Sequence, residues 1–275
     1  MNRVPVDRIS PLIVACLAAT WLIWGSTYLA IKFALTSFPP FFQMGTRFVL
    51  AGSLLLFWAR CRSQRMPTLV QWRNASLIGT LMLGGGMGCV AYSEQSVASG
   101  LVVVFIAIVP LLTVLANLLF GMKPSRVEVL GISIGMAGVL LLARGHSFSA
   151  SPGGLTAVSI ATLSWSTGSV LSLHRFPLAP GSGGFASEMI CGGAILLMIS
   201  QLLGERFHWP PQPLASVAWM YLVVFGSLIA FTAYMTLILI IRKSNYISKI
   251  IMPEILSVYL PNILFVNKIQ TKCFQ

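Results

Sequence analysis

The sequence predicts an all-α integral membrane protein made of two inverted repeats of transmembrane helices, and three observations lead to that prediction. Hydrophobic residues make up 56% of the 275 residues and charged residues only 9%, whereas about 25% of the residues in a soluble domain are charged. Apolar windows of about 20 residues, the length that a helix needs to cross a bilayer, recur along the chain. The second half of the sequence also repeats features of the first.

Eight windows are long and apolar enough to form membrane-spanning helices. Short connections such as "TSFPP" and "GERFHWPPQPLAS" separate them, and the prolines and glycines in these connections are typical of helix ends. None of the connections is long enough to hold a soluble domain. The predicted spans are residues 12–31, 41–58, 75–92, 101–120, 129–143, 155–173, 185–203 and 217–241.

The net charge of +12 is placed along the chain in a pattern that predicts topology. Basic residues gather in every second connection, namely Arg3, Arg8, Arg60, Arg62, Arg65, Arg73, Lys123, Arg126, Arg175, Arg242 and Lys243. The opposite connections carry only Arg144 and Arg206, with Lys32 at their edge. Because basic loops stay on the cytoplasmic side, the pattern predicts a cytoplasmic N-terminus. It also accounts for the charge without nucleic acid, so we expect no nucleic-acid partner.

Two offsets show the internal repeat. At an offset of 141 residues, the motif "WGST" that starts at Trp24 falls on "WSTG" that starts at Trp165, and Gly52 falls on Gly193. At an offset of 147, "WRNASLIGTL" falls on "WMYLVVFGSL". Five predicted helices separate the copies, and an odd number inverts the second half, as in many secondary transporters with a substrate site near the midplane. Chance similarity between apolar helices is the alternative.

The motifs "WGST" and "WSTG" place small polar residues inside apolar helices. Small residues let helix backbones approach closely, and hydroxyl groups bond across helices in lipid. The motifs therefore favour close packing of the first helix of each half around a central cavity. Tight packing alone and direct contact with a substrate both fit this pattern, and Trp24, Ser26, Thr27, Trp165 and Thr167 are the candidate substrate-binding residues in the second case.

The segments "TWLIWGSTYLAIKFAL", "FFQMGTRFVLAGSLLL" and "FIAIVPLLTVLANLLFGMKPSRVEVLGISIGMAGVLLL" resemble the EamA family of the drug/metabolite transporter superfamily, and the likeness covers about residues 13–235. The resemblance implies a bacterial inner-membrane exporter of amino acids and other small metabolites that works by alternating access. It implies ten helices in two inverted five-helix repeats, with the first, third, sixth and eighth helices lining the cavity. Its implied partners are a small-molecule substrate and the lipid bilayer, and a homodimer is left open.

The chain departs from this family pattern after about residue 235. We assign residues 12–143 to the first repeat, 155–241 to an incomplete second repeat and 242–275 to a divergent tail. The 40 residues from Thr236 to the end contain no glycine or alanine, although the chain has 24 glycines. This composition suggests a frameshift or insertion near Thr236. The rival hypotheses are therefore a non-transporting relic or membrane packing protein, and a membrane receptor or sensor.

Charged residues inside spans are costly in a membrane and are candidates for function. Arg47 lies about six residues into the second span, where it either faces the cavity and binds an anionic group such as a carboxylate, or reaches toward the headgroups. Its repeat counterpart at offset 141 is Glu188, and inversion predicts no direct salt bridge between them. Glu188 and Glu94 are proton-coupling candidates, although we expect Glu94 to stay solvated at the end of the third helix.

The sequence also offers two tyrosines as candidate site residues, and it lacks the motifs of common enzyme classes. Tyr92 and Tyr234 are candidates for aromatic walls of the substrate site, and an interfacial aromatic belt is the alternative. The only aspartate is Asp7, and the three histidines lie in separate loops without metal-ligand spacing. No Walker A motif is present. We therefore expect no catalytic residue, metal or cofactor, and transport driven by a gradient.

Overall fold

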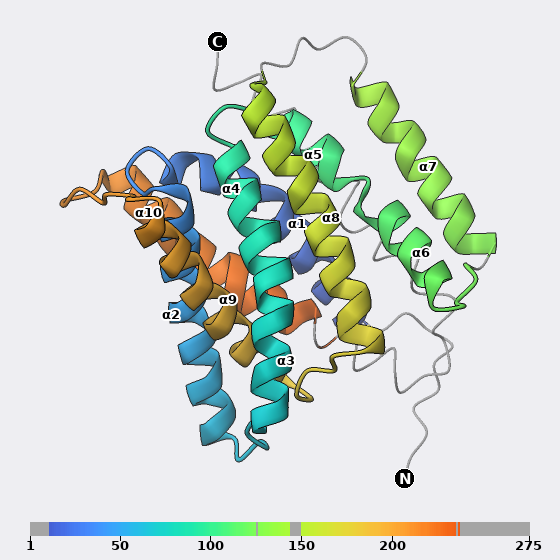
Figure 1. The fold of residues 1–275 in the computed structure, drawn as a ribbon, viewed down its shortest axis with the longest axis horizontal. Helices are drawn as coiled ribbons and strands as arrows, with labels where there is room; N and C mark the ends of the chain where they lie inside the picture. The colour runs from blue at the N-terminus through green and yellow to red at the C-terminus, as the bar shows by residue number, and fades with distance from the viewer. Residues whose placement is uncertain (1–10, 125, 144–149, 235, 237–275) are drawn as a thin grey trace.

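The computed structural model describes residues 11–124, 126–143, 150–234 and 236 (Figure 1). Within this part the regular structure is helical, which confirms the predicted all-α class. The helices are α1 (Pro11–Ala34), α2 (Pro40–Cys61), α3 (Leu69–Gly79), η1 (Thr80–Gly88), α4 (Cys89–Ser93), α5 (Ser99–Ile106), α6 (Val109–Leu119), α7 (Arg126–Ala143), α8 (Pro152–His174), α9 (Ser182–Leu202), α10 (Pro213–Tyr221) and η2 (Leu222–Ile229).

Six helical segments in the described residues are long and apolar enough to cross a membrane. They are Pro11–Ala34, Pro40–Cys61, Leu69–Ser93, Ser99–Leu119, Ser182–Leu202 and Pro213–Tyr234. The fourth is interrupted between α5 and α6, where Pro110 occupies the first turn of α6 and removes a backbone donor from the helix. The predicted spans at 129–143 and 155–173 also form helices, α7 and α8, but are not among these six.

Helix α8 is long enough to span but is rich in hydroxyl residues. Most of these hydroxyls bond within the helix itself; Ser159 Oγ donates to the carbonyl of Leu155 and Ser166 Oγ to that of Thr162, both at 2.8 Å. Ser164 instead donates to the carbonyl of Leu81 in η1, also at 2.8 Å. These hydroxyls are therefore satisfied by backbone acceptors within the bundle, as a membrane environment requires.

Helices α2 and α9 form the centre of the bundle and cross at small residues. A Cβ atom added to Gly45 would lie 3.0 Å from the carbonyl oxygen of Gly193, and one added to Gly52 would lie 2.9 Å from that of Ala186. Ala186 follows Gly45 by 141 residues, and Gly193 follows Gly52 by the same 141. The 141-residue offset therefore maps each of these two contacts onto the other. A two-fold axis that relates the two halves would produce this pattern.

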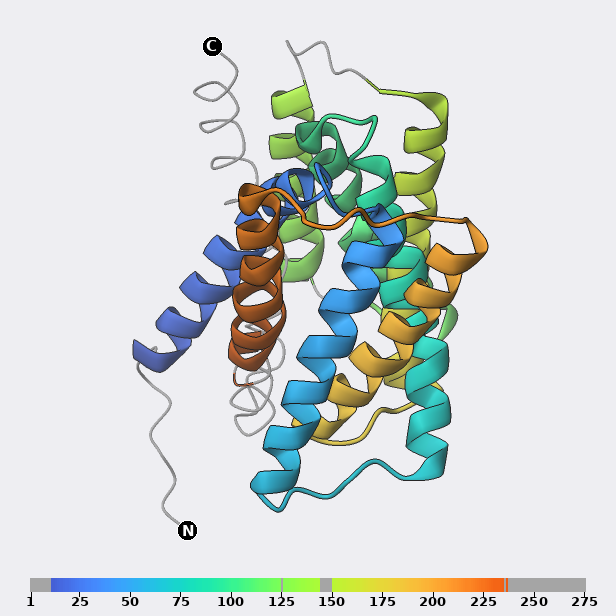
Figure 2. The same cartoon turned by 90° about the vertical axis from the view of Figure 1, so that its left-hand side faces the viewer.

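The first helix of each half packs against the third helix of the other half. Helix α1 lies against α10 and η2, whereas α8 lies against η1 and α4 (Figure 2). Both third helices contain a π-helical stretch, η1 and η2, and such stretches often occur at functional sites. The two halves are thus interlocked, and each contributes helices to two equivalent contacts.

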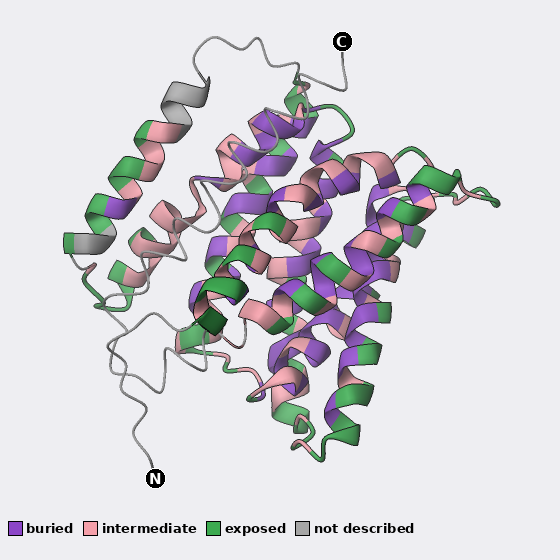
Figure 3. Ribbon diagram, turned by 180° about the vertical axis from the view of Figure 1, so that it is seen from behind, coloured by how far each residue is buried: buried purple, intermediate pink, exposed green. Residues whose placement is uncertain are grey.

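The connections alternate between two ends of the bundle. Residues 62–68 and 175–181 lie at one end, here called the basic end, and residues 35–39, 94–98 and 203–212 lie at the other, the low-charge end (Figure 2). Buried residues concentrate where the central helices cross, and many outward positions carry exposed apolar side chains, as expected for a surface in lipid (Figure 3). Residues 237–275 lie outside the described residues, so the assignment of a divergent tail stays a prediction.

Candidate functional site

Arg47 of α2 is buried against the second half of the chain, with only 2% of its surface exposed. Its Nε donates a hydrogen bond to Ser227 Oγ of η2 at 2.8 Å. Nη1 lies 3.7 Å from Met44 Sδ, and the guanidinium carbon lies 4.8 Å from the centre of the Phe48 ring. Of the two sequence-based alternatives, reaching toward the headgroups does not occur in this structure.

Gly226 makes room for this guanidinium. A Cβ atom at this position would lie 3.0 Å from Arg47 Nη2 and 3.1 Å from Thr27 Cγ2. The absence of a side chain therefore lets α1, α2 and η2 meet around Arg47. Ser227, the next residue, then supplies the hydrogen-bond acceptor.

The positive charge of Arg47 has no acidic partner among the described residues, since no carboxylate oxygen there lies within 4.0 Å of it. In particular, no ion pair joins Arg47 to Glu188 within that part of the chain. A buried charge without a counterion is unfavourable by several kcal/mol per ion. The arrangement is therefore chemically suited to an anionic group, which a guanidinium binds through paired hydrogen bonds.

Aromatic and hydroxyl groups of α1 and of the helical segment Pro213–Tyr234 meet along the helix contact that also holds Gly226 and Ser227. The Trp24 ring lies 5.6 Å from that of Phe231 and 5.5 Å from that of Tyr234. Ser26 Oγ is hydrogen-bonded to the Tyr221 hydroxyl at 2.6 Å. The structure thus brings five of the eight candidate substrate-binding residues to one helix contact, namely Trp24, Ser26, Thr27, Arg47 and Tyr234.

Trp165 and Thr167 lie elsewhere, on α8, and Trp165 is at the equivalent contact between α8 and η1. Trp165 packs against Gly86, where an added Cβ atom would lie 2.9 Å from Trp165 Cε3. Thr167 is exposed. The repeat therefore separates the two aromatic motifs instead of uniting them in one site.

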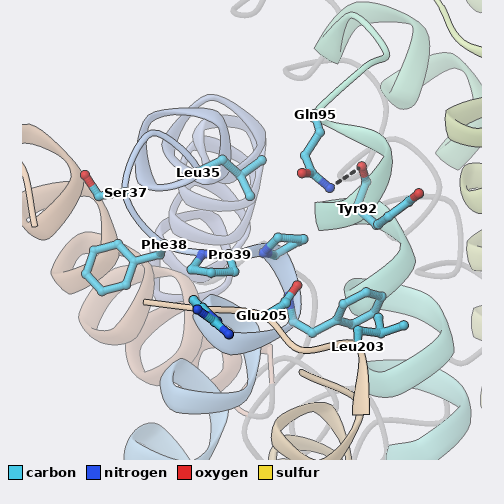
Figure 4. A pocket seen from close by; sticks show the side chains of 11 residues that line it. Leu35, Ser37, Phe38, Pro39, Tyr92, Gln95, Leu203 and Glu205 are labelled. Atoms are coloured by element: carbon cyan, nitrogen blue, oxygen red, sulfur yellow. Dashed lines mark hydrogen bonds between the residues drawn. The ribbon is translucent and has the colours of Figure 1, made fainter. Parts of the chain in front are cut away.

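Tyr92 is 43% exposed and belongs to a third location. It lines a pocket of about 490 Å³ at the low-charge end, and its ring lies 6.1 Å from that of Phe41 (Figure 4). The corner between α1 and α2, the end of α4 and the connection from α9 to α10 supply the other lining residues, Leu35, Ser37, Phe38, Pro39, Pro40, Gln95, Leu203, Glu205 and Arg206.

The expectation that Glu94 stays solvated is wrong. Only 3% of its surface is exposed, and Ser99 Oγ donates to its Oε2 at 2.6 Å. Lys32 of α1 lies near enough to lower the pKa of Glu94, but burial dominates and raises it to about 8. The sequence places Glu94 at a helix end, which favours solvent, but the fold covers that end with α1 and α5.

Glu188 of α9 is also buried, with 4% exposed. Its carbonyl oxygen would lie 2.7 Å from a Cβ atom at Gly79. Gly79 and Gly226 are repeat counterparts at offset 147, as Arg47 and Glu188 are at offset 141. A glycine of the third helix therefore packs against each member of this pair of charged residues.

Sequence reasoning missed two residues at this helix contact and one in the pocket at the low-charge end. Ser227 binds Arg47, and Tyr221 binds Ser26, through the hydrogen bonds described above. Glu205 accepts hydrogen bonds from the backbone N–H groups of Phe41 at 3.2 Å and Phe42 at 2.8 Å, and so caps α2. The position of Ser227 beside Gly226 in the repeated motif was the one available signal.

Two interlocked helical halves with a buried charge between them define a polytopic membrane protein of the transporter type. The model of the EamA-like transporter family matches residues 9–144. The chain is 41% identical over 223 residues to the uncharacterized inner membrane transporter YedA of Escherichia coli K12, covering 81% of this chain and 72% of that protein.

More distant similarities agree with this result. The WAT1-related chloroplastic protein At3g02690 of Arabidopsis thaliana is 28% identical over 230 residues, covering 79% of this chain and 55% of that protein. A crystal structure that is 23% identical shares the fold with a TM-score of 0.62, covering 81% of this chain and 77% of that one. The chain belongs to the EamA-like transporter family, which confirms the resemblance seen in the sequence.

Proposed function

We propose that this chain is a secondary transporter that exports small carboxylate-bearing metabolites, such as amino acids, from the cytoplasm across the bacterial inner membrane. The observation that carries the proposal is the buried guanidinium of Arg47, which has no acidic partner in the described chain. A substrate carboxylate would supply the missing negative charge. Membership of a transporter family supports movement of a solute, and the site supports its chemical class.

Different residues at this contact would bind different parts of the substrate. Ser227 fixes the guanidinium through Nε, which leaves the terminal nitrogens to meet a carboxylate. Trp24 and Tyr234 offer aromatic surface to the apolar part of a substrate. Ser26 and Tyr221 form a polar pair on the same helix contact that can exchange its internal hydrogen bond for one to the substrate.

Alternating access would follow from the crossing of α2 and α9. At Gly45, Gly52 and Gly193 the backbones of α2 and α9 are in close contact. The two halves can therefore rock against each other at this crossing without steric hindrance from side chains. Rocking would separate α1 from η2 and open the Arg47 site toward one side of the membrane at a time. The basic end faces the cytoplasm in this scheme.

The test measures efflux of isotopically labelled amino acids from cells that express the chain, with membrane abundance determined in parallel. Arg47→Gln should abolish efflux at normal abundance, and Arg47→Lys should weaken it because an ammonium cannot form the paired hydrogen bonds. Arg60→Gln, an exposed position on the same helix, is the matched control. Equal efflux from Arg47→Gln and the parent chain would refute the role of Arg47.

The alternative of a non-transporting relic or packing protein makes a different prediction. In that case the parent chain accumulates in the membrane without exporting any labelled amino acid, and no Arg47 variant changes the metabolite profile. Replacing residues 236–275 by a family-like ninth and tenth helix would then restore export. That result would show that the divergent tail causes the loss of transport.

A further inference from the structure

Glu94 links three helices at the low-charge end. It follows α4 directly, its Oε2 accepts a hydrogen bond from Ser99 at the start of α5, and it acts electrostatically on Tyr28 and Lys32 of α1. The carboxyl group thus lies where the first helix meets the end of the third span and the start of the fourth.

The partners of this carboxyl group are too few for a buried anion. Oε1 is buried and has no hydrogen-bond partner in the described residues. One hydroxyl donor does not replace the hydration of a carboxylate, so burial favours the neutral, protonated form. The raised pKa of about 8 agrees, since burial outweighs the opposing effects of Ser99 and Lys32.

Within the described residues, the surrounding helices add no further partner. Helix α1 supplies Tyr28 and Lys32, and α5 supplies only the Ser99 hydroxyl. The segments of η1 and α8 that pack on α4 contain no acidic residue and no lysine or arginine. The buried arginine of α2 bonds Ser227 instead.

We propose that Glu94 is the proton-binding residue of this transporter and that its protonation controls the packing of α1 against Glu94 and the start of α5. The inference rests on the proposed transport function. Two exposed neighbours, Tyr92 and Gln95, lie on either side of Glu94 in sequence and line the pocket at the low-charge end. Protons therefore exchange with water at that end.

The contact with α1 connects the proton to the substrate site. Tyr28 and Lys32 follow the Trp24 motif by about one and two turns of the same helix. A protonated Glu94 keeps α1 packed, whereas an ionised one favours separation of α1 and entry of water. Because α1 also carries the groups beside Arg47, each change of protonation shifts the substrate site.

The first experiment detects the protonation state of the Glu94 carboxyl group directly. The purified full chain, reconstituted in vesicles of phosphatidylethanolamine and phosphatidylglycerol, is titrated while the infrared carbonyl band of protonated carboxylic acids is recorded. Part of the band should disappear with a midpoint at about pH 8. Glu94→Gln should lose that component, and Glu188→Gln, a change at another buried glutamate, should keep it. An unchanged component in Glu94→Gln would overturn the proposal.

Two further variants keep the carboxyl group and test its surroundings, in case Glu94→Gln fails to fold. Ser99→Ala and Lys32→Met should each move the midpoint to higher pH, because both native residues lower the pKa of Glu94. A midpoint that stays in place in both variants would show that the titrating group is not Glu94.

The second experiment tests coupling in the same vesicles, loaded with a labelled amino-acid mixture. Glu94→Gln should retain exchange in the absence of a gradient and lose the acceleration that a pH gradient gives the parent chain. If the variant still responds to the gradient, coupling through Glu94 is wrong. If the parent chain moves no amino acid while its infrared titration stands, the proposed transport function fails instead.

Discussion

Arg47 and Ser227, 180 residues apart in the sequence, are joined across the two halves of the protein by a hydrogen bond of 2.8 Å between Nε and Oγ. This contact ties the second helix of the first half to the third helix of the second half. It also fixes the orientation of a buried guanidinium that no carboxylate neutralises in the described residues.

Ser227→Ala should destabilise the protein, because it removes the acceptor and leaves Arg47 Nε without a partner. Hydrogen bonds to charged groups contribute about 1.5–3 kcal/mol. Thermal unfolding in detergent would show the loss, while Ser133→Ala, at an exposed hydroxyl bonded to its own helix, should have little effect. Equal losses in the two variants would contradict the importance of the Arg47 contact.

Gly226→Ala should impair both folding and transport. Its methyl group would lie 3.0 Å from Arg47 Nη2 and 3.1 Å from Thr27 Cγ2, so the helices must move apart. Overpacking of this kind costs about 1–3 kcal/mol. Gly135→Ala, where nothing lies within 4 Å, serves as the control and should be neutral or stabilising. Wild-type unfolding and efflux in Gly226→Ala would show that the site is less tightly packed than the structure indicates.

Gly193→Val should prevent assembly of the two halves. Even a Cβ atom there would lie 2.8 Å from the backbone nitrogen of Val49 and 3.0 Å from the carbonyl oxygen of Gly45, and backbone atoms cannot rotate away. Size-exclusion chromatography of the solubilised protein should show aggregation or loss, whereas Gly138→Ala should behave normally. A monodisperse Gly193→Val protein would argue against the crossing of α2 and α9.

Glu205→Gln should loosen the start of α2. The carboxylate accepts from the N–H groups of Phe41 and Phe42, and Pro39 at the cap position offers no side-chain acceptor. Capping interactions contribute about 0.5–2 kcal/mol. The unfolding temperature should fall more than in Arg206→Gln, a change at the neighbouring exposed residue. Faster hydrogen exchange at the start of α2 would locate the effect.

The stability of the protein should decline as the pH rises from about 5 to about 8. The pKa of Glu94 is about 8 in the folded state against 4.5 for an ordinary glutamate. The folded state therefore holds the proton more tightly, so the stabilisation is complete below about pH 4.5 and is lost as the pH rises through about 8. Thermal unfolding over this range should show a smaller decline in Glu94→Gln than in the parent chain.

Most of the predicted helices appear in the structure, and their boundaries differ for a physical reason. Hydropathy marks only the apolar part of a helix, so α3 begins at Leu69 with a capping box at Thr68, several residues before the predicted start of that span. The break between α5 and α6 could have been predicted from Pro110, but apolar content alone conceals it.

The site was only partly predictable. Arg47 is conspicuous because a charge in an apolar span is rare, and the "WGST" motif is conspicuous for the same reason. Ser227 and Tyr221 are ordinary residues of an apolar helix. Apart from the place of Ser227 in the repeated motif, nothing in the sequence links them to partners that lie about 180 and 195 positions earlier. Such pairings arise only when the two halves pack together.

The sequence by itself determined that the chain is an all-α membrane protein and that it belongs to a transporter family, because hydropathy and the order of motifs can be read directly along the chain. The tertiary structure decided which side chains are buried and with whom. Glu94 shows the difference: its place at a helix end predicts solvent, but α1 and α5 cover it. Burial depends on helices distant in sequence, so only the folded chain reveals it.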